Sequence, residues 1–164
     1  ILIDSRATCL GCLVPRKKTF SVSGRAKAFF SAAASEGLPT EVLYAEDQGY
    51  EDARIGINET DRAIFGRIDG LFCSTDLMAI GALDALRIDL SIAVPEQIQV
   101  LGFDDIEQAN WGSFNLSTIR QDVDAQTYTV VRLLKERIAD NTLANRVERQ
   151  RLTVVLRGTT LHDG

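Results

Sequence analysis

Short apolar runs alternate along this chain with longer segments in which apolar residues recur at helical spacing. The apolar runs predict strands at residues 10–14, 41–45, 70–73, 98–103 and 153–156. Most of these runs are apolar throughout, as is typical of strands that are covered on both faces. Between them the spacing predicts helices at residues 21–36, 50–65, 74–88 and 124–139. Strands that alternate with helices indicate an α/β fold with a mainly parallel sheet.

Capping residues and apolar stripes support these helices. Ser21 or Ser23 can cap the first helix and Gly37 ends it. The third helix carries a stripe of Leu77, Ile80, Leu83 and Leu86, and the last one a stripe of Val130, Val131, Leu134 and Ile138. The segment WGSFNLSTIRQD, residues 111–122, fits neither pattern and predicts an ordered loop that leads to an edge strand.

Composition narrows the class of protein. With 164 residues, 45% hydrophobic, we expect a single core. The net charge of −5 argues against direct binding of a polyanion, which requires a cluster of Lys and Arg. No apolar run approaches the roughly 20 residues that cross a bilayer, so no membrane partner is expected. Three cysteines, an odd number, fit a reducing compartment and a cytoplasmic location.

Cys9 and Cys12 form a C-x-x-C pair, which could be a redox dithiol, half of a zinc site or two buried small residues. A redox pair needs a helix N-terminus, but this pair lies at a predicted strand. Zinc needs further ligands, and only Cys73 and His162 remain. We therefore interpret the pair as structural and predict no metal and no cofactor.

Catalytic patterns are sparse. His162 is the only histidine and lies close to the end of the chain, which disfavours a catalytic triad. The adjacent acids Asp104 and Asp105 follow a predicted strand and are more typical of caps or ligand acceptors than of an acid/base pair. We expect no catalytic residues, and a small α/β enzyme remains an alternative.

Polar side chains follow the predicted strands where each strand ends. Since ligands of open α/β sheets bind outside the carboxyl ends of the strands, these residues predict a site for a small polyhydroxylated or anionic molecule. They are Ser21, Arg25, Glu46, Asp47, Gln48, Ser74, Thr75, Asp76, Asp104 and Asp105. Helix capping explains some of them equally well, Asp76 above all.

The order of five segments resembles the effector-binding domain of the LacI/GalR family of bacterial transcription regulators. The segments are SVSGRAKAFF, CSTDLMAIGALDALR, VPEQIQVLGFDDIEQA, LSTIRQD and VVLRGTT. The resemblance implies a periplasmic-binding-protein-like, three-layer α/β/α sandwich. It further implies a small-molecule effector bound between two subdomains, a homodimer, and operator DNA bound only through a helix-turn-helix domain that this chain lacks. A periplasmic sugar-binding transport receptor shares the fold and remains the alternative.

The family plan also divides the chain. Residues 1–8 would end a helix of the N-terminal subdomain, residues 9–118 and 152–164 would form the C-terminal subdomain, and residues 119–151 would cross between the two with a long helix. The chain has no initiator Met, so we expect a fragment of a longer regulator.

The resemblance assigns roles to individual residues. The expected effector contacts are Ser21, Arg25, Gln48, Thr75, Asp104 and Gln121. The expected dimer-interface residues are Leu77, Ile80, Trp111 and Phe114. This chain departs from the family pattern with Ala28 in place of Gly, Thr75 in place of Asn, and Gln48 in place of an aromatic. A carboxylate or a purine-like effector therefore stays open beside a sugar.

Overall fold

The computed structural model describes residues 1–3, 5, 7–17 and 19–161. Its main sheet has four parallel strands in the order β2-β1-β3-β4. The strands are β1 (Leu10–Pro15), β2 (Thr40–Ala45), β3 (Gly70–Cys73) and β4 (Gln99–Leu101). All four coincide with predicted apolar runs, which confirms the predicted α/β fold class.

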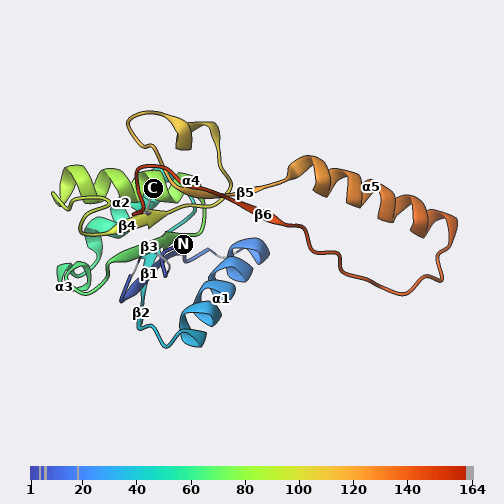
Figure 1. Cartoon of the computed structure of the whole chain (residues 1–164), viewed down its shortest axis with the longest axis horizontal. Coiled ribbons are helices and arrows are strands. Elements are labelled where there is room, and N and C mark those ends of the chain that lie inside the picture. The colour runs from blue at the N-terminus through green and yellow to red at the C-terminus, as the bar shows by residue number, and fades with distance from the viewer. Residues whose placement is uncertain (4, 6, 18, 162–164) are drawn as a thin grey trace.

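Helices cover both faces of this sheet (Figure 1). The helix α1 (Phe20–Ser35) lies on one face, and α2 (Tyr50–Glu59) and α4 (Asp76–Asp84) lie together on the other. The short helix α3 (Arg62–Phe65) follows α2, and a π-helical turn (Ala85–Asp89) extends α4. A short 3₁₀ turn spans Glu107–Asn110.

The predicted helix at residues 50–65 is in fact two helices. Thr60 ends α2 in an extended conformation, and the side chain of Asp61 accepts a hydrogen bond from the backbone of Ala63 at the start of α3. Thr and Asp favour such caps over helix interiors because their side chains bind nearby backbone groups. The break therefore follows from capping chemistry inside a periodic apolar pattern.

The central strand β1 is buried on both faces. Leu10 and Cys12 pack in the α1 core, whereas Leu13 packs in the core under α2 and α4. Cys12 and Cys73 are buried and free, and burial raises the pKa of Cys12 to about 12. Cys9 precedes the strand and is partly exposed. The burial of Cys12 supports the structural interpretation of the C-x-x-C pair, which stays a prediction for the partly exposed Cys9.

Leu2 and Ala7 also pack in the α1 core. The described part of the first eight residues thus contacts this unit itself, although the family plan predicts it as the end of a helix of the other subdomain. The family division of the chain stays a prediction.

Residues 118–155 form an arm that projects from this body (Figure 1). Strands β5 (Thr118–Gln121) and β6 (Leu152–Val155) pair antiparallel and lead to and from α5 (Val123–Ala139). The predicted strand at residues 153–156 and helix at 124–139 are both present. However, the apolar stripe of α5 is exposed, with side chains at Val130, Val131, Leu134 and Ile138 open to solvent.

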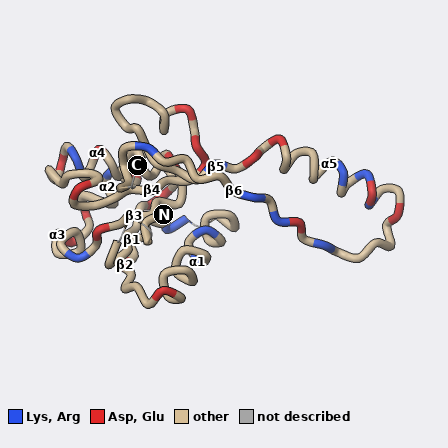
Figure 2. Tube along the Cα trace, in the orientation of Figure 1, with Lys and Arg blue, Asp and Glu red and all other residues tan. Residues whose placement is uncertain are grey.

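Residues of both charges are interspersed along the body and the arm (Figure 2). Within the described residues, no helix is long and apolar enough to cross a membrane.

Candidate functional site

Arg25, on the second turn of α1, reaches the polar edge where the parallel strands end. Its guanidinium donates to the carboxylate of Asp104, which follows β4, with N–O distances of 2.8 and 3.2 Å. It also donates to the backbone carbonyl of Ser74, which follows β3, at 2.8 Å. One side chain thus joins the ends of two strands, at the edge where open α/β sheets bind their ligands.

The Arg25 guanidinium also lies over the Phe103 ring, with its central carbon 3.9 Å from the ring centre. The face of an aromatic ring carries negative potential, which attracts a cation. The side chain of Arg25 is 15% exposed and that of Asp104 is 30% exposed. This ion pair is therefore largely shielded and held in one orientation, but solvent or a ligand can reach it.

Gln121 completes the cluster from β5. Its side-chain amide donates to Oδ1 of Asp104 at 2.8 Å, and Gln126 in turn donates to the Gln121 side-chain oxygen at 3.2 Å. A carboxylate offers about four lone-pair sites. Arg25 and Gln121 together donate three hydrogen bonds to Asp104, so capacity remains for a ligand hydroxyl.

The other three predicted contacts lie at the same edge but do not join this cluster. Thr75 caps α4, where its hydroxyl accepts from the backbone of Met78, and Ser21 lies within 3.2 Å of the Thr19 hydroxyl. The backbone of Gln48 donates to its neighbour Asp47. Among the described hydrogen bonds, none links these three side chains to Arg25, Asp104 or Gln121, so their role as effector contacts stays a prediction.

Asp104 and Asp105 share an unusual backbone conformation. Their φ angles are 122° and 56°, both in the left-handed region that residues other than glycine seldom adopt. Each such residue costs on the order of 1–3 kcal/mol and persists only where its surroundings hold it. The backbone N–H of Asp104 donates to the carbonyl of Ile119 at 2.9 Å, and this bond helps to hold the pair.

Asp105 faces away from the Arg25 cluster and binds two other arginines. It accepts from Arg120 at 2.5 Å and from Arg157 at 2.7 Å, and its side chain is only 8% exposed. Burial alone would raise the pKa of Asp105, but the hydrogen bonds and charges of Arg157 and Arg120 outweigh it and lower that pKa. The sequence indicates Asp105 only as a strand-end acid, and Arg157 only as part of the motif VVLRGTT.

Asp76 is a fully buried carboxylate behind this edge. It accepts from the Thr118 hydroxyl at 2.5 Å and from the backbone of Ile106 at 2.9 Å. Burial raises its pKa above the ordinary value despite these bonds. Thr75 supplies the cap of α4, so Asp76 is not the capping residue and instead joins α4 to β5.

Two of the predicted dimer residues are exposed. Leu77 is 42% and Trp111 49% exposed, and the Trp111 ring stacks on Phe114 with 6.4 Å between ring centres. Phe114 packs partly against the core. Ile80 is only 3% exposed and lies within that core, so it offers little surface to a partner.

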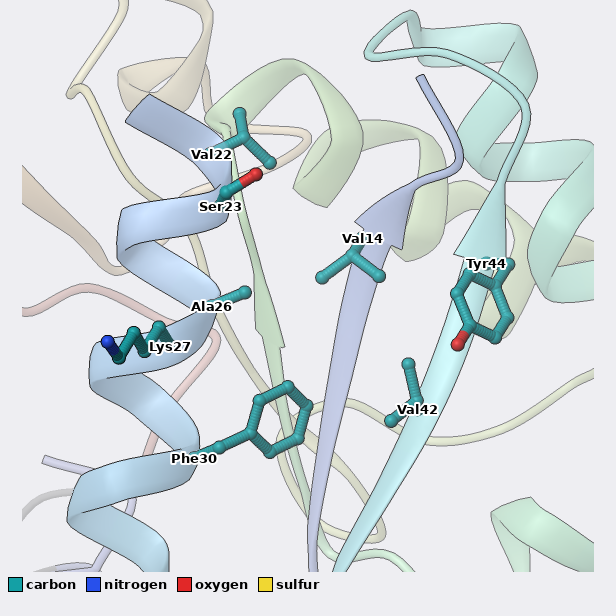
Figure 3. A pocket seen from close by; sticks show the side chains of 8 residues that line it. All are labelled: Val14, Val22, Ser23, Ala26, Lys27, Phe30, Val42 and Tyr44. Atoms are coloured by element: carbon teal, nitrogen blue, oxygen red, sulfur yellow. The ribbon is translucent and has the colours of Figure 1, made fainter. Parts of the chain in front are cut away.

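A separate hollow of about 260 Å³ lies between α1 and the edge strand β2 (Figure 3). Its walls include Val14, Val22, Phe30, Val42 and Tyr44. None of the six predicted effector contacts lines this hollow, so it is distinct from the Arg25 cluster. In the part of the chain that the structure describes, no group of three or more His, Cys, Asp or Glu is placed to hold a metal. His162 lies outside the described residues.

Residues 2–160 match the family model of the periplasmic binding protein-like domain. The chain belongs to this family. Curated relatives in the family are transcriptional repressors: the chain is 30% identical over 159 residues to the repressor PurR of Vibrio parahaemolyticus, covering 96% of this chain and 47% of that protein. The PurR of Aliivibrio fischeri strain MJ11 is 28% identical, with 98% and 48% covered. The chain thus spans about half the length of these relatives.

Solved structures in the family agree. A LacI family regulator from Arthrobacter sp. FB24 is 27% identical, with a TM-score of 0.80, over 98% of this chain and 60% of that one. The same regulator in complex with lactose is 26% identical with a TM-score of 0.77, over 98% and 59%. These matches confirm the resemblance to LacI-type effector-binding domains. The relatives are regulators, not enzymes, so the comparisons favour neither the enzyme nor the transport receptor.

Proposed function

We propose that this chain supplies one side of the effector site in a LacI-type regulator, and that the effector is a sugar or a similar small polar metabolite. The observation that carries the proposal is the cluster of Arg25, Asp104 and Gln121 at the carboxyl edge of the sheet. This cluster combines fixed donors with a partly exposed acceptor. Neighbouring hydroxyl groups of a sugar need both kinds of partner.

The bound relative supports a sugar in particular. The regulator from Arthrobacter sp. FB24 was solved with lactose, and it is 26% identical to this chain. The fork of Arg25 would equally suit a carboxylate. A purine-like effector is the other alternative, and titration with each class of ligand separates the three.

Control of DNA binding would be allosteric. Effector binding would close two subdomains, and the altered dimer would present its DNA-binding domains differently. Such an effector must bind the two states with different affinities, because a ligand with equal affinity for both shifts neither. The acidic net charge of −5 supports operator contact through another domain of the regulator, acting in the cytoplasm.

The arm is best explained as the segment that crosses to the second subdomain. Tyr128, Leu134 and Ile138 on α5 are 71%, 57% and 83% exposed, an unusual load of apolar side chains for a free helix. We expect these side chains to be buried against the remainder of the regulator. Leu77 and Trp111 on the body are the surface we assign to the homodimer.

The test is a thermal-shift and calorimetric titration of the complete regulator with lactose, ribose, a sugar carboxylate and hypoxanthine. Binding of a sugar that Arg25→Ala abolishes is the expected result. If only hypoxanthine binds, the effector is purine-like and the proposal of a sugar is wrong. If the Arg25→Ala variant binds the sugar as tightly as the wild type does, Arg25 is not an effector contact. The 164-residue chain should bind the same sugar more weakly than the complete regulator, since it supplies only one side of the cleft.

A further inference from the structure

Two neighbouring acids at the end of β4 bind different parts of the molecule. Asp104 binds Arg25 and Gln121 at the proposed effector site. Asp105, the next residue, binds Arg120 on β5 and Arg157 just beyond β6. One peptide unit therefore separates a carboxylate at the effector site from a carboxylate that holds both segments leading to the arm.

Arg157 is tightly held. It donates to the carbonyl of Leu116 at 2.7 Å as well as to Asp105, and its side chain is 11% exposed. Its backbone N–H donates to the Ser117 hydroxyl at 2.8 Å. Asp105 and Arg157 thus join the chain as it leaves the body to the chain as it returns, at the base of the arm.

The backbone between the two acids leaves little room for independent motion. Both residues are in the left-handed region, and the N–H of Asp104 is bonded to Ile119 on β5. A ligand that pulls on the Asp104 carboxylate further than its side-chain rotations allow would change the backbone torsions of this pair or move both residues together. Because Asp105 binds two arginines, its displacement would also move β5 and the segment that returns after β6.

We propose that Asp105 is a positioning residue that couples the effector site to the base of the arm. The coupling runs from Arg25 through Asp104 and Asp105 to Arg157. Asp105 does not contact the effector. This inference rests on the proposed function only for the identity of the ligand site, because the coupling itself exists without ligand.

The test is a double-mutant cycle on the 164-residue chain, read by residue-specific amide hydrogen exchange. Arg25→Ala perturbs the effector site, and Asp105→Asn cuts the proposed link. Asn tolerates positive φ, so the backbone of residue 105 is retained. The amides of Arg157 and Gly158 are the reporters, since both are hydrogen-bonded at the arm base.

We expect Arg25→Ala to speed exchange at both reporters by about fivefold or more, as in local opening. In the Asp105→Asn background the same substitution should have little further effect. Asp89→Asn is the matched control, because Asp89 also binds an arginine, Arg54, in two places. In that background the effect of Arg25→Ala should persist in full.

A purely structural role for Asp105 would speed exchange in the Asp105→Asn variant without abolishing the effect of Arg25→Ala, and this result would overturn the proposal. So would unchanged reporters in the Arg25→Ala variant. If Asp105→Asn does not fold, Arg120→Gln can be used instead. It removes only the ion pair between Arg120 and Asp105, at a side chain that is 54% exposed. Failure of every ligand to bind would instead refute the proposed function and leave this cycle unaffected.

Discussion

The guanidinium of Arg25 lies over the ring of Phe103, with 3.9 Å between the guanidinium carbon and the ring centre. The same guanidinium uses two nitrogens for Asp104. A lysine at this position would keep the charge but lose both the fork and the flat stacking surface. The geometry of Arg25, and not its charge alone, thus holds this cluster together.

If the effector is the proposed sugar, Arg25→Lys should weaken its binding by about tenfold or more, which corresponds to about 1.4 kcal/mol. Calorimetric titration of the complete regulator measures this. Arg54→Lys is the control, because Arg54 makes the same kind of paired bonds to Asp89 away from the site. Equal losses in the two variants would mean that Arg25 contributes only to general stability.

The sequence predicted that Arg25 and Asp104 lie at one edge of the sheet, because the underlying rule is simple. The carboxyl ends of parallel strands meet at one edge, and Arg25 and Asp104 follow two such strands. The same rule does not predict the bonds of Asp105 to Arg120 and Arg157. They depend on how the chain returns beside β4 after the arm, which no local pattern encodes.

The sequence also predicts which faces of the helices are apolar, but not what covers each face. Periodicity predicted apolar stripes on both α4 and α5, yet α4 is buried nearly all round while the stripe of α5 is exposed. A stripe indicates that a surface will be covered, but not by which part of a protein. Ile80 is covered by the core of this unit, whereas Leu134 is 57% exposed.

Close contact between α2 and α4 depends on a glycine. A Cβ at Gly81 would lie 2.1 Å from the carbonyl oxygen of Tyr50, whereas a Cβ at Gly24 on α1 would meet nothing within 4 Å. Gly81→Ala should lower the free energy of unfolding by about 1–3 kcal/mol through overpacking. Gly24→Ala should raise it by about 0.5–1 kcal/mol through helix propensity. Urea unfolding measures both free-energy changes. Changes of the same sign in the two variants would contradict the close contact between the helices.

The three thiols should differ in reactivity. Cys12 and Cys73 are fully buried, whereas Cys9 is partly exposed, and burial raises the pKa of all three thiols. Since the thiolate is the reactive form, a disulfide reagent at pH 8 should modify Cys9 first in the native chain and all three thiols in urea. Mass spectrometry of the modified peptides identifies the sites. Rapid native labelling of Cys12 would contradict its burial in β1.

A polar substitution on the exposed face of α5 should lower the unfolding free energy only in a protein where another surface covers that face. Leu134→Lys changes a side chain that is 57% exposed, so the unfolding free energy of the 164-residue chain should change by less than about 0.5 kcal/mol. In the complete regulator the same substitution should cost about 2 kcal/mol or more, because it would place a charge against apolar surface. Thermal unfolding of both proteins compares the effects. Equal, small effects would mean that α5 stays exposed in the regulator.

The two carboxylates at the base of the arm should respond to acid in opposite directions. The pKa of Asp105 is lowered in the folded chain, so its stabilising contribution is complete above about pH 4, the ordinary range of an unfolded Asp, and is lost as the pH falls through the folded value. The advantage of the wild type over Asp105→Asn in unfolding free energy should therefore be largest near pH 7 and shrink in acid.

Asp76 has a raised pKa, so protonation on acidification relieves the cost of its burial. Relative to Asp76→Asn, the wild type should gain stability as the pH falls. Urea titrations at pH 7, 4 and 3 compare the pairs, and parallel trends would show that the two carboxylates do not differ as the structure indicates.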